Sequence, residues 1–208
     1  MEDKKLHILK NVGKLYLKFG IRSVTMDDVA REFGISKKTL YLYFTDKKDL
    51  VGQVIDYYKE NPVFNLNEKN TGNAIDRIFA LRSHLAKILK YFNNNLERDL
   101  KKMYPDLFKT VYQFKRMRIL NEIRINMEDG IREGLFRAGL SPEFIAKLQV
   151  GQMLYTLNPE KGVFNENETA TIELFDQIMD YHMHAICTGE GLDYYRKQLN
   201  RIQNEEKN

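Results

Sequence analysis

The segment from Thr25 to Phe44 constrains the fold more than any other part of the chain. Thr25 is suited to cap a helix that runs to about Phe33. Gly34 and Ser36 then supply a turn and a second cap, because glycine readily takes the left-handed conformation and a serine hydroxyl can accept hydrogen bonds from free amides. A short helix follows, to Phe44. The spacing therefore predicts two helices joined by a three-residue turn.

The side chains of these two helices divide into an inner and an outer set. Ala30 is small where two helices must approach closely, and Val29, Ile35, Leu40 and Phe44 can share one core. The second helix then presents polar side chains outward, namely Ser36, Lys37, Lys38, Thr39, Tyr41 and Tyr43. Donors and cations of this kind suit phosphates and base edges in a DNA major groove. The pattern predicts a helix-turn-helix whose second helix is the recognition helix.

Positive charge is concentrated in the first 50 residues. The chain carries 33 Lys and Arg against 29 Asp and Glu, a net charge of +4. Eleven of the basic and seven of the acidic residues lie in residues 1–50, and the other 158 residues hold 22 of each. Such a local excess suits a module that binds a polyanion, because neutralising phosphates supplies sequence-independent affinity for DNA. A solvated face without a partner is the alternative interpretation.

The rest of the chain is predicted to be helical as well. Only four prolines occur, and no stretch alternates apolar and polar residues as a strand would. Helices are predicted over about residues 4–19, 25–33, 36–44, 47–58, 73–93, 96–103, 105–134, 142–157, 169–188 and 192–202, with polar loops at 61–71 and 158–167. The fold class is all-α: an N-terminal three-helix helix-turn-helix domain in residues 1–50 and a larger C-terminal helical bundle in 51–208, about nine or ten helices in total.

Several classes of protein are disfavoured by the sequence. Cys187 is the single cysteine, so an intramolecular disulfide and a thiolate metal cluster are excluded, and a reducing cytoplasm is the expected location. No apolar run is long enough to span a bilayer. His182 and His184 are two residues apart, which does not place them on one helix face as a metal-binding pair. With no phosphate loop, nucleophile elbow or acid/base pair, we expect no enzyme activity, metal or cofactor.

The N-terminal residues resemble the motif of the tetracycline-repressor (TetR) family of transcriptional regulators. The matching residues are Gly20, Thr25, Val29, Ala30, Gly34, Ile35, Ser36, Leu40, Tyr41, Tyr43, Phe44, Lys47 and Leu50. Phe33 departs from the pattern, since the family usually has a small residue there, and Lys38 stands where glycine is frequent. The resemblance covers about residues 5–51 and implies an all-helical dimer with a ligand-receiving C-terminal domain, residues 51–208.

Roles for single residues follow from the resemblance. It implies that Thr25, Tyr41, Tyr43 and Lys47 hold the DNA backbone. Lys37, Lys38 and Thr39 match positions that face bases or nearby phosphates, and Ser36 would cap the recognition helix and touch phosphate. The dimer interface would come from the helices near 142–157 and 169–188. Residues 1–50 would be the DNA-binding domain.

Candidates for a ligand pocket come from polar side chains on apolar stripes. Arg118 and Asn121 fall in line with Val111, Phe114 and Ile125 on one predicted helix. A buried Arg or Asn needs a partner, which a bound ligand would supply. The alternative is that Arg118 extends to solvent or pairs with an acid on a neighbouring helix. Further candidates are Tyr112, Gln149, Met153 and Tyr155.

The sequence therefore predicts a DNA-binding transcriptional regulator. Each monomer would read one half-site, so we expect a homodimer on a palindromic operator. The favoured hypothesis is a repressor that a small-molecule effector releases from the operator. In one alternative, the C-terminal domain only dimerises or binds a protein partner. In another, the protein is a helical enzyme, which would show no salt-dependent affinity for DNA.

Overall fold

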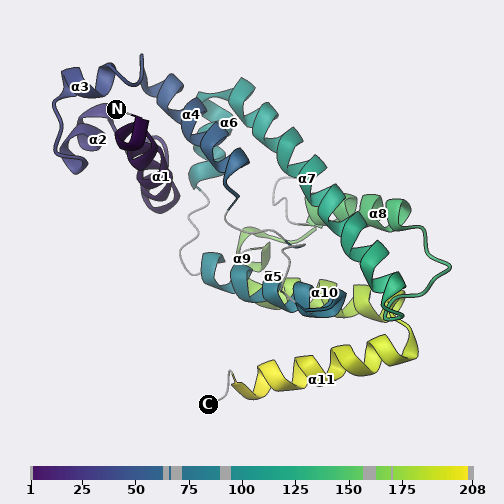
Figure 1. The fold of residues 1–208 in the computed structure, drawn as a ribbon. Helices are drawn as coiled ribbons and strands as arrows, with labels where there is room; N and C mark the ends of the chain where they lie inside the picture. Colours follow the sequence, from purple (N-terminus) through teal and green to yellow (C-terminus); the bar gives the residue numbers. More distant parts are fainter. Residues whose placement is uncertain are drawn as a thin grey trace. The chain divides into compact units, whose positions relative to one another are not determined.

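The structure is a computed structural model of the 208-residue chain that describes residues 2–62, 66, 72–89, 95–156, 163–169 and 171–205. Within these residues the chain forms eleven α-helices and no β-strand (Figure 1), which confirms the predicted all-α fold and comes close to the predicted number of helices. In the same residues, no helix is both long and apolar enough to cross a membrane.

The chain divides into two compact units. The first unit contains residues 1–63 and 91–115, and the second contains residues 64–90 and 116–208. The long helix α7 (Pro105–Arg132) contributes its first residues to the first unit and the remainder to the second.

The first unit is built around α1 (Glu2–Phe19). It also contains α2 (Met26–Glu32), α3 (Lys37–Tyr41), α4 (Lys47–Glu60), α6 (Asn95–Met103) and the start of α7. Figure 1 shows α2 and α3 beside α1 at the N-terminal end of the chain. One face of α1 is buried in a core that it shares with the helix-turn-helix, α4 and α6; this core includes Ile8, Val12, Val29, Leu40, Phe44, Leu50 and Leu100.

Helix α3 is shorter than predicted. The sequence predicted a helix over 36–44, whereas α3 ends at Tyr41. The backbone tightens there, because the Leu42 amide donates to the Thr39 carbonyl and the Tyr43 amide donates to the Leu40 carbonyl, each three residues earlier, at 3.2 and 3.0 Å. The predicted recognition helix is therefore a short element held in place by the fully buried Leu40.

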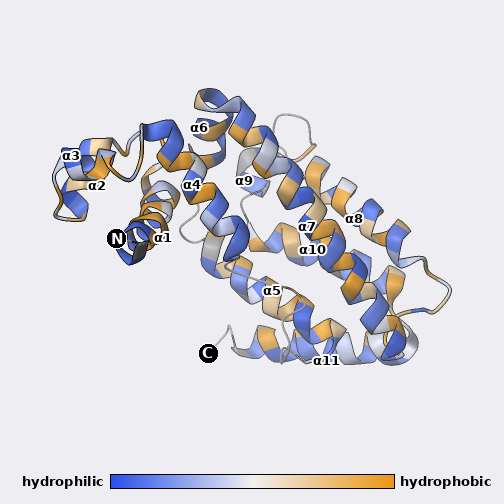
Figure 2. Cartoon of the chain, turned by 45° about the horizontal axis from the view of Figure 1, so that its top comes forward, coloured by the Kyte–Doolittle hydropathy of each residue, from blue (hydrophilic) through white to orange (hydrophobic). Residues whose placement is uncertain are grey.

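The second unit contains the remaining helices. They are α5 (Ala74–Leu89), α7 from residue 116, α8 (Pro142–Thr156), α9 (Glu166–Thr169), α10 (Ile172–Ile186) and α11 (Gly189–Glu205). Figure 2 shows apolar and polar residues interspersed along these helices, as expected where each buries one face. The shared core includes Ile75, Met127, Phe136, Ala146, Met183 and Ile186.

Two ion pairs between distant residues join helices of the second unit. The Arg77 guanidinium of α5 lies 2.7 Å from the Asp129 carboxylate of α7. The Arg82 guanidinium of α5 makes two bonds to Asp176 of α10, Nε to Oδ1 at 2.7 Å and Nη2 to Oδ2 at 2.8 Å. Both arginine side chains are buried, so these pairs fix α5 against its neighbours.

Helix α11 begins earlier than predicted, at Gly189 instead of residue 192. The Thr188 hydroxyl accepts a bond from the Gly191 amide at 3.1 Å, which caps the helix in spite of its two glycines. Gly191 itself lies against the turn after α7, where a Cβ atom on this residue would meet the Leu135 carbonyl oxygen at 2.0 Å. Only glycine allows this approach.

The short helix α9 corrects the prediction of a continuous polar loop over 158–167. The Asn165 side chain accepts bonds from the amides of Asn167 and Glu168 at 3.0 and 3.2 Å, and the Asn165 amide donates to the Glu168 carboxylate at 2.8 Å. This reciprocal capping supports a single helical turn. Residues 158–162 of the predicted loop, and most of the predicted loop 61–71, lie outside the described residues.

Candidate nucleic-acid interface

The first helix of the motif, α2, is fixed by a reciprocal cap at Thr25. The Thr25 hydroxyl accepts a bond from the Asp28 amide at 3.2 Å, and the Asp28 carboxylate accepts bonds from the Thr25 amide and hydroxyl at 3.0 and 2.6 Å. The hydrogen bonds from Thr25 lower the pKa of the Asp28 carboxyl below its usual value, and the nearby Arg31 guanidinium adds to the effect. This confirms the predicted cap.

The turn between α2 and α3 positions Ser36, the residue that caps the N-terminus of α3. Gly34 has a φ of +58°, the left-handed region that favours glycine. The Ser36 hydroxyl then accepts a bond from the Thr39 amide at 3.0 Å and lies 2.8 Å from the Thr39 hydroxyl. Ser36 therefore caps α3, as predicted, and its hydroxyl remains at the surface.

The outer face of α3 carries polar and aromatic side chains. Lys37, Lys38 and Tyr41 are exposed and Thr39 is half-buried. The Lys37 ammonium lies 2.9 Å from the Asp27 carboxylate of α2, and this contact raises the pKa of Lys37 above its usual value. Both side chains are more than half exposed, so the pair is weak in water and a DNA phosphate can replace the carboxylate.

Tyr43 and Lys47 lie just beyond α3. Tyr43 is half-buried, with its ring centroid 6.2 Å from that of Phe44. Lys47 is the first residue of α4, and its ammonium donates to the Arg22 carbonyl at 3.3 Å. Partial burial lowers the pKa of Lys47, although the charges of Asp99 and Asp28 oppose this shift. The ammonium is thus held close to the loop before α2.

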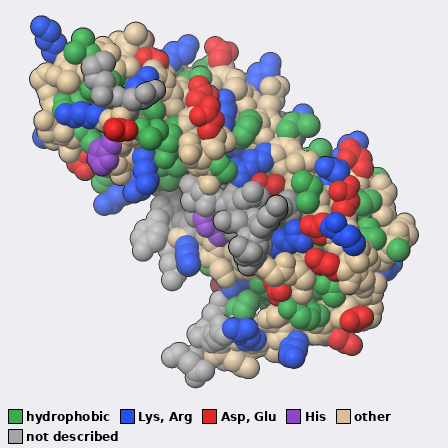
Figure 3. All heavy atoms as spheres, in the orientation of Figure 1, with side chains coloured by type: hydrophobic (Ala, Val, Ile, Leu, Met, Phe, Trp, Pro, Cys, Tyr) green, Lys and Arg blue, Asp and Glu red, His purple; other side chains and the backbone are tan. Residues whose placement is uncertain are grey.

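The eight residues predicted to contact DNA all lie in one stretch of the first unit. Thr25 and Ser36 cap the two helices of the motif, four residues lie on α3, and two follow it: Lys37, Lys38, Thr39, Tyr41, Tyr43 and Lys47. Figure 3 shows Lys and Arg side chains, with acidic ones among them, over the part of the surface that α1 to α3 form. The arrangement offers cations and hydroxyls on a protruding short helix.

Two features of this surface were missed by sequence reasoning. Leu42, directly after α3, is 78% exposed, although its residue type gave no reason to place it outward. The Arg22 amide donates to the Asp99 carboxylate of α6 at 2.8 Å. These two residues are 77 positions apart, and no short-range pattern in the sequence signals such a pair.

The predicted pocket residues are divided between the two compact units. Tyr112 belongs to the first unit and is exposed, whereas the others belong to the second unit. Arg118 pairs with Glu122 on its own helix at 2.7 Å, and the exposed Asn121 accepts a bond from Arg124 at 2.9 Å.

Gln149 and Met153 on α8 complete this set. Gln149 is buried, with its Nε2 atom 3.9 Å from the Met179 sulfur, and Met153 is half-buried. Tyr155, on the same helix, is largely exposed. A groove in the second unit is instead lined by residues of α5, α10 and α11, and by none of these candidates.

An all-helical chain with a capped helix-turn-helix and an outward recognition helix defines a DNA-binding transcriptional regulator. The sequence model described as "Bacterial regulatory proteins, tetR family" matches residues 10–54. The N-terminal part of the chain therefore carries the DNA-binding domain of the TetR family of transcriptional regulators, as its motif predicted.

Similar proteins extend the match beyond the N-terminal motif. The uncharacterized HTH-type transcriptional regulator YvaF of Bacillus subtilis is 24% identical over 180 residues, which cover 82% of this chain and 90% of YvaF. The biofilm operon icaADBC negative transcriptional regulator IcaR of Staphylococcus aureus is 28% identical over 118 residues, or 55% of this chain and 57% of IcaR. The TetR family protein CprB of Streptomyces coelicolor, solved with its operator sequence, shares the fold, with 13% identity, a TM-score of 0.60 and 98% coverage of both chains.

Proposed function

We propose that this regulator is a homodimeric repressor that reads a palindromic operator and is released from it by a small molecule. The observation that carries the DNA-reading part is the outer face of α3, where Lys37, Lys38 and Tyr41 are exposed on a helix anchored by the buried Leu40. Repression is supported by the relative IcaR, which is a negative regulator, and operator binding by the structural neighbour CprB.

In this proposal different side chains contact different parts of the DNA. Thr25, Tyr41, Tyr43 and Lys47 hold phosphates, while Lys37, Lys38 and Thr39 face base edges or nearby phosphates, and Ser36 contributes its surface hydroxyl. The proposed DNA-binding domain is residues 1–50, and residues 51–208 form the proposed ligand-binding and dimerisation domain. These two domains are defined by their proposed roles, whereas the two compact units described above are defined by the packing of the chain.

The test is binding of the purified protein to the DNA upstream of its own gene, titrated against salt and nonspecific competitor. We expect competitor-resistant binding, a two-fold symmetric footprint and affinity that falls steeply with salt. Replacing Lys37, Thr39 and Tyr41 together by Ala should abolish the footprint, and the matched control Lys197→Ala, on α11, should leave it unchanged. Undiminished operator binding by the triple variant would contradict the DNA-reading proposal.

The proposed dimer uses the outer face of α8. Phe144, Leu148 and Tyr155 are 62%, 56% and 60% exposed, and their spacing of four and seven residues places them on one face of the helix. Large apolar side chains that share an exposed face mark an interaction surface. A second copy of the chain covers it in this proposal, since a two-fold operator requires two recognition helices.

Sedimentation of the full chain tests the dimer. Leu148→Glu would place a charge in the proposed interface and should convert the dimer into a monomer at micromolar concentration. Leu6→Glu, at a similarly exposed leucine of α1, is the matched control and should leave the dimer intact. If both variants sediment as the unaltered protein does, the interface lies elsewhere.

The third part of the proposal is a small-molecule effector. A ligand releases the operator only if it binds the DNA-free state of the dimer more tightly than the DNA-bound state. The candidate contacts within the second unit are Arg118, Asn121, Gln149 and Met153, whereas the fifth candidate, Tyr112, belongs to the first unit. Cytoplasmic location is part of the same proposal, because the regulator acts on chromosomal DNA. A small-molecule library screened for loss of the footprint tests it.

The pairing of Arg118 supports the alternative in which the C-terminal domain only dimerises or binds a protein. Its guanidinium has a carboxylate partner on its own helix, Glu122, so no ligand is required to neutralise it. One result distinguishes the two proposals. The effector proposal is favoured by a compound that releases operator DNA from the unaltered protein but does not release it from the Arg118→Ala or Gln149→Ala variant. If these variants respond as the unaltered protein does, the effector does not use these residues.

A further inference from the structure

The loop between α1 and α2 is held in place from two sides. Ile21 and Val24 are buried in the core of the first unit, whereas Arg22, between them, is exposed. The Arg22 amide donates to the Asp99 carboxylate of α6 at 2.8 Å, and the Arg22 carbonyl accepts a bond from the Lys47 ammonium at 3.3 Å. The backbone of Arg22 is therefore fixed by one residue of α6 and one residue of α4.

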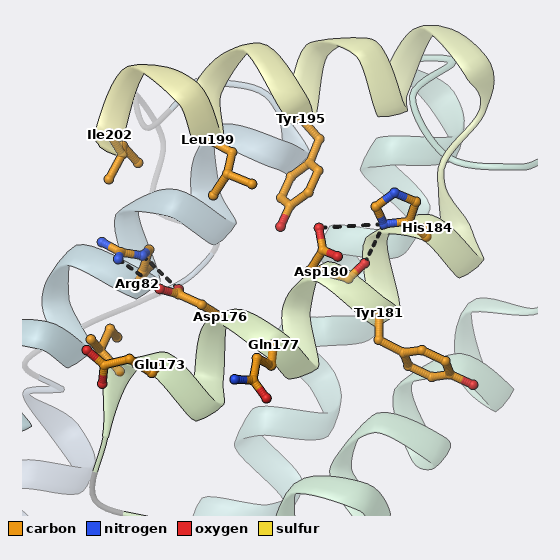
Figure 4. Close-up of a pocket in the computed structure, with 11 residues that line it drawn as sticks. Arg82, Glu173, Asp176, Gln177, Asp180, Tyr181, His184, Tyr195, Leu199 and Ile202 are labelled. Carbon is orange, nitrogen blue, oxygen red and sulfur yellow. Dashed lines mark hydrogen bonds and ion pairs between the residues drawn. The ribbon is translucent and has the colours of Figure 1, made fainter. Parts of the chain in front are cut away.

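The side chain of Arg22 is not bound in this way. Among the residues that the structure describes, no hydrogen bond or ion pair involves its guanidinium. The Arg82 guanidinium of the second unit shows the contrast, because it makes two bonds to the Asp176 carboxylate (Figure 4). Arg22 thus combines an ordered backbone with a guanidinium whose five N–H donors are available to a partner outside the chain.

Arg22 lies beside residues that the proposed function places on the DNA backbone. Its carbonyl binds Lys47, and Thr25 follows it by three residues. The Lys47 ammonium uses a donor within the protein, so only part of its hydrogen-bonding capacity is left for DNA. A guanidinium can bind a phosphate through two parallel N–H bonds, which a lysine cannot do. The loop is therefore suited to add a phosphate contact to those of the helix-turn-helix.

The Asp99 carboxylate should affect DNA binding in two opposite ways. Its negative charge by itself repels phosphates. Its hydrogen bond, however, fixes the Arg22 amide, and a loop that is ordered before binding loses less entropy when DNA binds. Removal of the carboxylate should strengthen DNA binding if only the charge matters, and weaken it if the hydrogen bond matters more. The sign of the change therefore separates the two effects.

We propose that Arg22 binds a phosphate of the DNA backbone and that Asp99 of α6 is the residue that positions it. The inference rests on the DNA-binding part of the proposed function and adds to it a contact that lies before the helix-turn-helix. A phosphate contact carries no sequence information. Arg22 should therefore contribute equally to binding of operator DNA and of an unrelated duplex.

The test is the salt dependence of DNA binding by the full-length protein, on the DNA upstream of its own gene and on an unrelated duplex. In about 0.1 M salt, Arg22→Gln should weaken binding to both at least about tenfold. It should also reduce the slope of log K against log salt by about two, one phosphate for each subunit of the proposed dimer. Arg22→Lys keeps the charge and should retain most of the slope. Lys197→Gln removes an equal charge from α11 and should change neither quantity.

Substitutions on α6 test the positioning role. Asp99→Ala should weaken binding to both duplexes about fivefold, the scale of one hydrogen bond, and reduce the salt slope, although it removes a negative charge. Asp99→Asn keeps an oxygen that can accept from the Arg22 amide and should bind at least as tightly as the unaltered protein. Glu97→Ala, the matched control, removes an exposed carboxylate of the same helix and should not weaken binding. Asp99→Ala should add little to the effect of Arg22→Gln, because it acts through Arg22.

The inference is overturned if Arg22→Gln leaves the salt slope unchanged, since the guanidinium then stays in solvent. It is equally overturned if Asp99→Ala strengthens binding, or if Glu97→Ala weakens binding as much as Asp99→Ala does. The proposed function fails by a different result, in which the unaltered protein binds the upstream DNA no better than the unrelated duplex; the slope on that duplex then still decides the role of Arg22. If Asp99→Ala disturbs folding, as seen by circular dichroism, the exposed Arg22→Gln and Arg22→Lys variants decide.

Discussion

The caps of the helix-turn-helix and the interhelical side-chain pairs of the second unit join residues over very different distances along the chain. In the helix-turn-helix, Thr25 pairs with Asp28 and Ser36 with Thr39, in each case within four residues. In the second unit, the partners are 52, 94 and 118 residues apart; these pairs are Arg77 with Asp129, Arg82 with Asp176, and Tyr194 with Asp76.

This difference in sequence separation determines how many helices are destabilised when one side chain is removed. A local cap stabilises the first turn of one helix and can be removed while the packing between helices remains. A buried pair between helices that are far apart in the sequence stabilises the tertiary structure. Its loss therefore destabilises both helices that the pair joins. Loss of a cap in the helix-turn-helix should therefore destabilise one helix, whereas loss of a buried pair in the second unit should destabilise the whole unit.

The largest effect is expected from Asp176→Ala. The buried Arg82 side chain loses its two bonds to the carboxylate, which should lower the free energy of unfolding by about 2–3 kcal/mol, less than for a fully buried pair because Asp176 is about a third exposed. Urea unfolding measures the loss, and hydrogen exchange should show faster opening of α5 and α10 together.

Glu173→Ala is the matched control for this change, on the same helix and exposed. It should alter the free energy of unfolding by no more than about 0.5 kcal/mol. Equal destabilisation by the two variants would mean that the Arg82 pair does not hold the second unit together.

A smaller effect is expected from Thr25→Ala, which should lower the free energy of unfolding by about 1 kcal/mol through loss of the cap. Hydrogen exchange should rise in α2 and leave α5 and α10 unchanged. Thr25→Ser keeps the hydroxyl and should behave as the unaltered protein does. Faster exchange throughout the second unit would remove the distinction between local and distant pairing.

The smallest effect concerns pH. Because the bonds from Thr25 lower the pKa of Asp28 in the folded protein, its contribution to stability is present above the ordinary value of 3.8 and is lost as the pH falls through the lowered pKa. An NMR titration of the Asp28 carboxyl should show a midpoint below 3.8, and Thr25→Ala should move that midpoint upward. A midpoint unchanged by Thr25→Ala would show that the cap does not bind the carboxylate.

The same distances explain which features could be predicted from the sequence. The caps at Thr25 and Ser36 were predicted because each residue and its partner lie within one helical turn. The all-α fold followed from helical periodicity. The short cap at Asn165 is equally local, but the surrounding polar residues favoured a loop, and the start of α11 was misplaced because two glycines suggested a break.

Features that need tertiary structure could not be predicted. The groove depends on Arg82 meeting Asp176, and the sequence gives no indication that these residues are neighbours. Arg118 and Asn121 were singled out for a shared helix face, yet each found a partner on its own helix, Glu122 and Arg124. The exposure of Leu42 likewise depends on where α3 ends.

The contact between Gly191 and Leu135 bears on how a saturation mutagenesis map of this protein should be interpreted. Gly191 has an ordinary helical backbone, so its φ angle does not require glycine; the space beside the Leu135 carbonyl does. If variants are selected for their ability to regulate a reporter gene, nearly every variant with a substitution at Gly191 should be lost from the population. The position would then resemble an effector contact, although its intolerance comes from the fit between a helix and a turn.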